Sequence, residues 1–213
     1  MSHSFRRLPF FAVLAASLAC LGCSTGEGEG AVSSDQLFID NCWNGPFELD
    51  PTFFAANPYR DQMMIRIQRG EDIQELSDGL LVLVDRVDAI RTGRLGEPID
   101  VGLPIGVFPP GVPIEANPDP PLVSLSLYLH NSCHNTNSAL YSIGGSITFE
   151  SLFSGNPNET DADDRLTDAR FEVDFADPRD QLATGEYPPG RVSRVNGYFR
   201  FFFQRGQPAQ PFP

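Results

Sequence analysis

The chain has 213 residues and a formal net charge of −13, from 15 basic and 28 acidic residues. Such an acidic balance repels phosphate backbones and argues against nucleic acid as a partner. The sequence contains no lysine, which excludes Schiff-base chemistry, a Walker lysine and serine–lysine mechanisms, because each of these needs an amine.

The N-terminus has the organisation of a signal peptide. Arg6 and Arg7 precede an apolar run that extends from Leu8 to about Gly22. This run is shorter than the roughly 20 residues that a membrane-spanning helix needs. We therefore expect residues 1–22 to direct export rather than to span a membrane permanently.

The apolar run ends in Leu21-Gly22-Cys23. This tripeptide resembles the lipobox of bacterial lipoproteins, in which the cysteine is lipidated, carries palmitate and becomes the first residue of the mature protein. The resemblance implies lipidation at Cys23, with Cys20 as the fallback. The sequence departs from the family at Cys20, where a lipobox usually has leucine, and a plain secretory signal is the alternative. By analogy with enterobacterial sorting, Ser24 favours the outer membrane.

Residues 23–35 are dominated by Gly, Ser and Glu, a composition that is typical of a flexible tether. We expect one folded domain over residues 36–213, which is enough chain for a substantial core. The 19 glycines, 19 prolines and 17 phenylalanines of the chain favour an all-β domain.

Apolar runs and period-two alternation predict the strands. In chain order they are expected near residues 37–42, 47–54, 62–69, 80–87, 122–130, 140–153, 169–176 and 195–203. The sixth of them should bend at Gly144-Gly145. Only residues 71–76 and 160–166 could form a helical turn or two. The proline-rich residues 104–121 cannot join a central sheet and predict a long surface connection.

These elements predict an antiparallel β-sandwich of about eight strands. In this arrangement the proline-rich crossover separates an N-terminal group of strands from a C-terminal meander. A closed β-barrel is the alternative.

The segment LYLHNSCHNTNS, residues 127–138, could hold a metal site, a catalytic cysteine or half of a disulfide. Cys42 and Cys133 are the cysteines left in the folded part after lipidation, and two cysteines in an exported domain usually pair. The spacing of His130, Cys133 and His134 suits zinc poorly, because adjacent residues rarely both ligate one ion. We therefore expect a Cys42–Cys133 disulfide and no metal, while the roles of the two histidines stay open.

Two further constellations remain as alternatives. The acidic residues 154–168 offer oxygen ligands of the kind that suits calcium, although they do not fit the EF-hand pattern. A pair of carboxylates could serve an envelope hydrolase, but nothing in the sequence singles out a pair.

The chain as a whole resembles bacterial lipoproteins that carry a single all-β domain after a lipobox-type signal. The resemblance implies no assigned activity. We expect a non-enzymatic, cofactor-free protein anchored by lipid to the outer membrane of the cell envelope. There it would bind an unidentified protein or carbohydrate partner or have a structural role.

Overall fold

A computed structural model describes residues 28–70, 77–104, 106–107, 121–133 and 139–204. Cys23, His134, the possible helix at 71–76 and most of the proline-rich connection lie outside the described residues. The strands are β1 (Gly28–Ile39), β2 (Trp43–Leu49), β3 (Phe53–Tyr59), β4 (Gln62–Gln68), β5 (Asp78–Asp85), β6 (Pro98–Gly102), β7 (Val123–Leu129), β8 (Ala139–Ser151), β9 (Leu166–Ala176) and β10 (Ser193–Phe202).

Helical structure is short in the described part of the chain. It consists of α1 (Val87–Gly93), α2 (Ala162–Arg165) and one 3-10 turn, Pro178–Asp180. Among the described residues, no helix has both the length and the apolar character needed to cross a membrane. The domain is therefore all-β, as the composition predicted.

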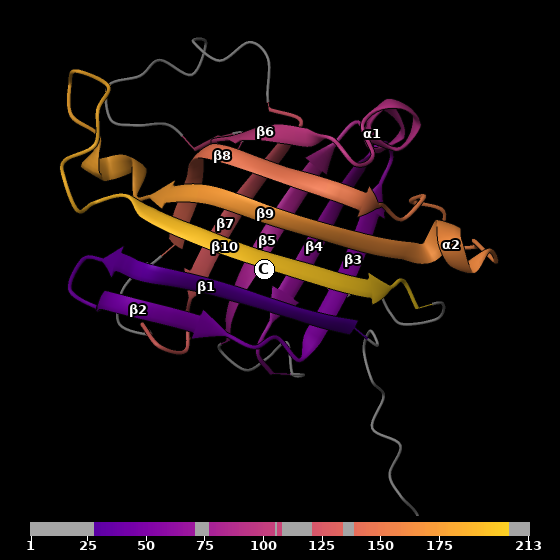
Figure 1. Ribbon diagram of the computed structural model, residues 1–213, viewed down its shortest axis with the longest axis horizontal. Helices are drawn as coiled ribbons and strands as arrows, with labels where there is room; N and C mark the ends of the chain where they lie inside the picture. Colours follow the sequence, from indigo (N-terminus) through magenta and orange to yellow (C-terminus); the bar gives the residue numbers. More distant parts are fainter. Residues whose placement is uncertain (1–27, 71–76, 105, 108–120, 134–138, 205–213) are drawn as a thin grey trace, which may run out of the picture.

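The strands form one mixed sheet in the order β2-β1-β10-β9-β8-β6-β7-β5-β4-β3. Neighbours are antiparallel except β6 and β7, which run parallel. Figure 1 shows that the sheet curls, so that β1, β10, β9 and β8 cross in front of β3, β4, β5 and β7. The N-terminal strands do not stay together as expected: β1 pairs with the C-terminal strand β10, whereas β3, β4 and β5 lie in the other half.

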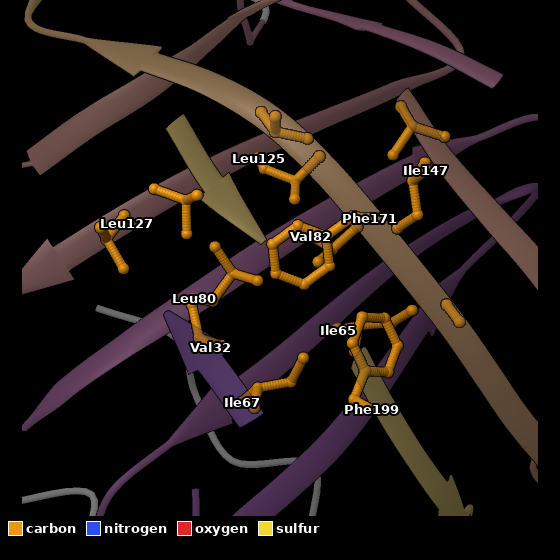
Figure 2. Close-up of a cluster of buried hydrophobic side chains, with 14 of the residues drawn as sticks. Val32, Ile65, Ile67, Leu80, Val82, Leu125, Leu127, Ile147, Phe171 and Phe199 are labelled. Atoms are coloured by element: carbon orange, nitrogen blue, oxygen red, sulfur yellow. The ribbon is translucent and has the colours of Figure 1, made fainter. Parts of the chain in front are cut away.

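The core lies between these two halves (Figure 2). The rear half contributes alternate residues of three neighbouring strands, all essentially inaccessible to solvent: Ile65, Ile67, Leu80, Val82, Leu125 and Leu127. The front half covers them with Val32, Ile147, Phe171 and Phe199. Burying each such side chain favours folding by about 1.5–3 kcal/mol. Because alternate residues in both halves are apolar, the sheet gains this energy when one half folds over the other.

Most of the expected strands occur with shifted ends. The single strand expected at 47–54 is wrong, because residues 50–52 separate β2 from β3. The short elements β6 and α1 were not expected. β6 is only five residues long, and α1 follows β5 directly, where apolar Val87 and Ile90 face the core. Local patterns are weak in such short elements. The expected bend in β8 is present as a register shift between Ser142 and Gly144. There, Gly145 has φ +98°, and a Cβ on it would lie 2.3 Å from the Glu172 carbonyl oxygen.

The expected tether over residues 23–35 is too long, because β1 begins at Gly28. Its first residues pair with β10, Gly28 opposite Phe201 and Gly30 opposite Phe199. Backbone hydrogen bonds form this part of the strand, so it needs few apolar side chains. The composition that resembled a flexible linker therefore belongs to the sheet from residue 28 onward, and Val32 is part of the core.

Candidate functional site

The histidine- and cysteine-containing segment lies at the end of β7. Strand β7 ends at Leu129, and the Cys133 amide then donates to the Leu129 carbonyl oxygen at 2.7 Å, closing a turn. His130 is exposed, and its ring centroid lies 5.1 Å from that of Tyr128. His134 lies outside the described residues, so the structure does not place the two histidines relative to each other.

The predicted disulfide between Cys42 and Cys133 is formed, with the two Cα atoms 5.8 Å apart. Cys42 precedes β2 at the turn after β1, whereas Cys133 follows β7. The bond therefore links the front half of the sheet to the rear half, and no strand pairing connects β1 or β2 to β7. A cysteine held in a disulfide has no thiolate, which removes Cys133 as a nucleophile.

A buried aspartate holds the turn that carries Cys133. Asp78, the first residue of β5, is 4% exposed. Its Oδ1 accepts from the backbone amides of Asn131 and Ser132, each at 3.0 Å, and its Oδ2 accepts from the Ser132 hydroxyl at 2.6 Å. Hydrogen bonds to a charged group are about twice as strong as neutral ones. Asp78 and the disulfide thus fix the same turn from two sides.

Next to this turn, Tyr128 and Gln68 form a polar pair on the outer face of the rear half. The Tyr128 hydroxyl donates to Gln68 Oε1 at 3.1 Å, and Gln68 Nε2 donates to the Gly70 carbonyl oxygen at 3.3 Å. Gly79 lies beneath the tyrosine ring, and a Cβ there would lie 2.4 Å from the Tyr128 hydroxyl oxygen. The glycine is therefore what allows Tyr128 to lie across β5 and reach Gln68.

Burial raises the pKa of Tyr128 to about 12; Arg66 opposes this shift and Asp78 adds to it. The hydroxyl therefore stays protonated at neutral pH, where it acts as a hydrogen-bond donor rather than as a base. Asp78 holds the turn, and Gln68 and Tyr128 are hydrogen-bonded to each other beside it. None of these groups is an activated nucleophile. The role of these groups is structural. The hydrogen bonds from Asn131 and Ser132 to Asp78 are called the latch of the turn.

Carboxylates of the acidic residues 154–168 make contacts within their own loop and with arginines outside it. Glu159 Oε1 accepts from the amides of Thr160 and Asp161, which lowers the pKa of Glu159. Asp161 caps α2 by accepting from the Asp163 amide, and Asp164 pairs with Arg91 of α1. Within the described ranges, no group of three His, Cys, Asp or Glu residues could hold a metal ion.

Carboxylates on the outer face of the front half are paired with arginines. Arg194 of β10 bonds both Glu172 and Asp174 of β9, and these bonds raise the pKa of Arg194. Arg200 pairs with Asp168 further along the same two strands. Cross-strand pairs of this kind stabilise a sheet modestly. Glu172 is exposed and Asp168 and Asp174 are half-buried, and each of these carboxylates has an arginine partner.

Sequence reasoning missed Asp78, which holds the turn, as well as Gln68 and Gly79, which position the Tyr128 side chain next to it. The available signal was the Asp78-Gly79 pair at the start of the apolar run of β5. It reads locally as an ordinary turn before a strand. Only the pairing of β5 with β7 brings Asp78, opposite Leu129, to the cysteine turn and places Gly79 opposite Tyr128.

The chain matches no family model, and neither a curated protein nor a solved structure matches it.

Proposed function

We propose that the chain is a lipid-anchored protein of the cell envelope, attached through Cys23, whose β domain has a non-enzymatic binding or structural role. The observation that carries this proposal is the Cys42–Cys133 disulfide joining the two halves of the sheet. Disulfides of this kind persist in oxidising compartments, which agrees with export by the N-terminal signal. The outer membrane is the proposed location, and the proposed partner is a protein or a carbohydrate.

The fold is proposed to be a β-sandwich made by one folded sheet rather than a closed barrel. The order of the strands leaves β2 and β3 as edges, with no pairing between them in the described part of the chain. In Figure 1 the front strands cross the rear strands at a steep angle, as in orthogonally packed sheets. A closed barrel would need a ladder of hydrogen bonds between those two edges.

The test is expression of the full-length chain in a Gram-negative host, followed by mass measurement of the mature protein. We expect cleavage before Cys23 and the added mass of a diacylglycerol with amide-linked acyl chain. Cys23→Ser should abolish this modification, whereas Cys20→Ser should leave it in place. A mature protein that is cleaved without added lipid would overturn the anchor. Modification that survives Cys23→Ser and is lost in Cys20→Ser would move it to Cys20.

The same preparation tests the disulfide. Non-reducing peptide mapping should recover the peptides of Cys42 and Cys133 as one linked species. Two free thiols in the exported protein would show that the disulfide is absent. The argument that the protein lies in an oxidising compartment would then fail.

A further inference from the structure

The start of β1 places a candidate lipid anchor close to the folded sheet. Only four residues, Ser24 to Glu27, separate Cys23 from Gly28. The five Cα–Cα steps from Cys23 to Gly28 span at most about 18 Å, even when the chain is fully extended. A lipid on Cys23 would therefore hold the Gly28 end of the sheet close to the membrane surface.

The sheet cannot easily lengthen this connection by releasing the start of β1. Gly28 and Gly30 are packed so tightly that an added Cβ would lie 2.6 Å from Phe201 Cβ at Gly28 and 2.8 Å from the Tyr198 carbonyl oxygen at Gly30. Both positions also lie against the ring of Phe54. Peeling the strand away would break its ladder with β10 and expose this packed contact to water.

The Gly28 end also presents an exposed aromatic side chain. Figure 1 shows that β1 begins where β10 ends and β9 begins, next to α2. Phe202, the last residue of β10, pairs with Leu166 and is 38% exposed. The opposite end of β1 carries the turn to Trp43, which lies about 36 Å away along a 12-residue strand.

We propose that the Gly28 end of the sheet, with Phe202 at its corner, lies against the bilayer that carries the anchor, so that the domain stands upright with Trp43 away from the membrane. This inference rests on the proposed lipidation of Cys23. The surface that fits this end is a bilayer with little net charge. Helix α2 and its cap bring Asp161, Asp163 and Asp164 to the Gly28 end of the sheet. Those carboxylates would be repelled by an anionic bilayer.

Tryptophan fluorescence tests this orientation, since Trp43 is the single tryptophan of the chain. The lipidated full-length protein is reconstituted into phosphatidylcholine vesicles whose acyl chains are brominated near the headgroup. Bromine quenches only tryptophans that reach the lipid. Three proteins are compared: the wild type, Trp43→Phe with Phe202→Trp, and Trp43→Phe with Tyr198→Trp.

The last two variants compare lipid contact at two positions along the same strand, β10. Tyr198 is exposed on the same face of β10 as Phe202, because the two are four positions apart, and it lies about 13 Å further from the end of the strand. We expect strong quenching at position 202, weaker quenching at 198 and none of Trp43. Inserting a flexible Gly-Ser linker of about 20 residues between Gly26 and Glu27, with a span of about 25 Å, should abolish the quenching at 202.

The outcomes separate this inference from the proposed function. Lipid on Cys23, shown by mass, with no quenching at 202 would overturn the upright orientation and leave the anchor intact. Quenching of Trp43 equal to or stronger than that at 202 would overturn it as well. Absence of lipid on Cys23 would overturn the proposed function itself. If Phe202→Trp fails to fold, the comparison of position 198 with Trp43 still decides, and equal quenching of the two would contradict the proposal.

Discussion

Phe54 of the edge strand β3 stacks on Phe201 of β10, with ring centroids 5.7 Å apart and planes inclined by 28°. The two strands belong to opposite halves of the curled sheet and are not hydrogen-bonded to each other. Gly28 and Gly30 of β1 lie against the same Phe54 ring. The start of β1 therefore contacts β10 in its own half and Phe54 in the other half. This packing explains why a glycine-rich segment forms a strand.

Replacing both glycines tests that contact. Gly28→Ala with Gly30→Ala should lower the free energy of unfolding by about 1–3 kcal/mol, because each new Cβ overlaps β10. The measurement is denaturant unfolding followed by circular dichroism. Gly93→Ala is the matched control: nothing lies within 4 Å of a Cβ at this helix position, so its stability should stay the same or rise slightly. Equal stability of both variants would mean that residues 28–30 are not packed.

Removing the disulfide should loosen the closure of the two halves. Cys42→Ser with Cys133→Ser should lower the free energy of unfolding by about 2–5 kcal/mol, because the bond closes a long loop of the unfolded chain. The cysteines are 91 residues apart. Chemical denaturation of the double variant and of reduced wild type should give similar midpoints. A variant as stable as the oxidised wild type would show that the bond contributes nothing to the closure.

Asp78 should matter more to stability than Asp85, the other aspartate of β5. Asp78→Ala leaves the Asn131 and Ser132 amides without their acceptor and should cost about 2–3 kcal/mol. Ser132→Ala removes one donor and should cost about 1 kcal/mol. The control is Asp85→Ala at the other end of the strand, where the carboxylate accepts from Gln62 at a half-buried site. An equal loss in Asp78→Ala and Asp85→Ala would contradict the latch.

Tyr128 should ionise at unusually high pH. Its pKa is raised from 10.0 to about 12 by burial, so its neutral form contributes stability in full below pH 10, and this contribution is lost as the pH rises towards 12. The measurement is the tyrosinate absorbance of wild type minus that of Tyr128→Phe, recorded while the near-ultraviolet circular dichroism shows a folded chain. The difference should rise near pH 12. In denaturant, where burial is absent, it should rise near pH 10, and a folded-state midpoint at pH 10 would show that Tyr128 is not buried.

Local patterns were sufficient where one face of a strand is buried and the other is not. The alternation in β7 and β10 indicated both strands and their buried faces, because a period of two depends only on neighbouring residues. The pairing of Cys42 with Cys133 followed from cysteine number and the expected compartment. The all-β class followed from composition and turn residues.

The tertiary structure alone decided which strands are neighbours. β1 is a strand from Gly28 because β10, from the other end of the chain, supplies its hydrogen-bonding partners, and such non-local pairing leaves no local hydrophobic pattern. The role of Asp78 likewise depends on β5 lying beside β7. Alternation along a strand records which face is buried, whereas the identity of the neighbouring strand depends on how the whole sheet folds over its core.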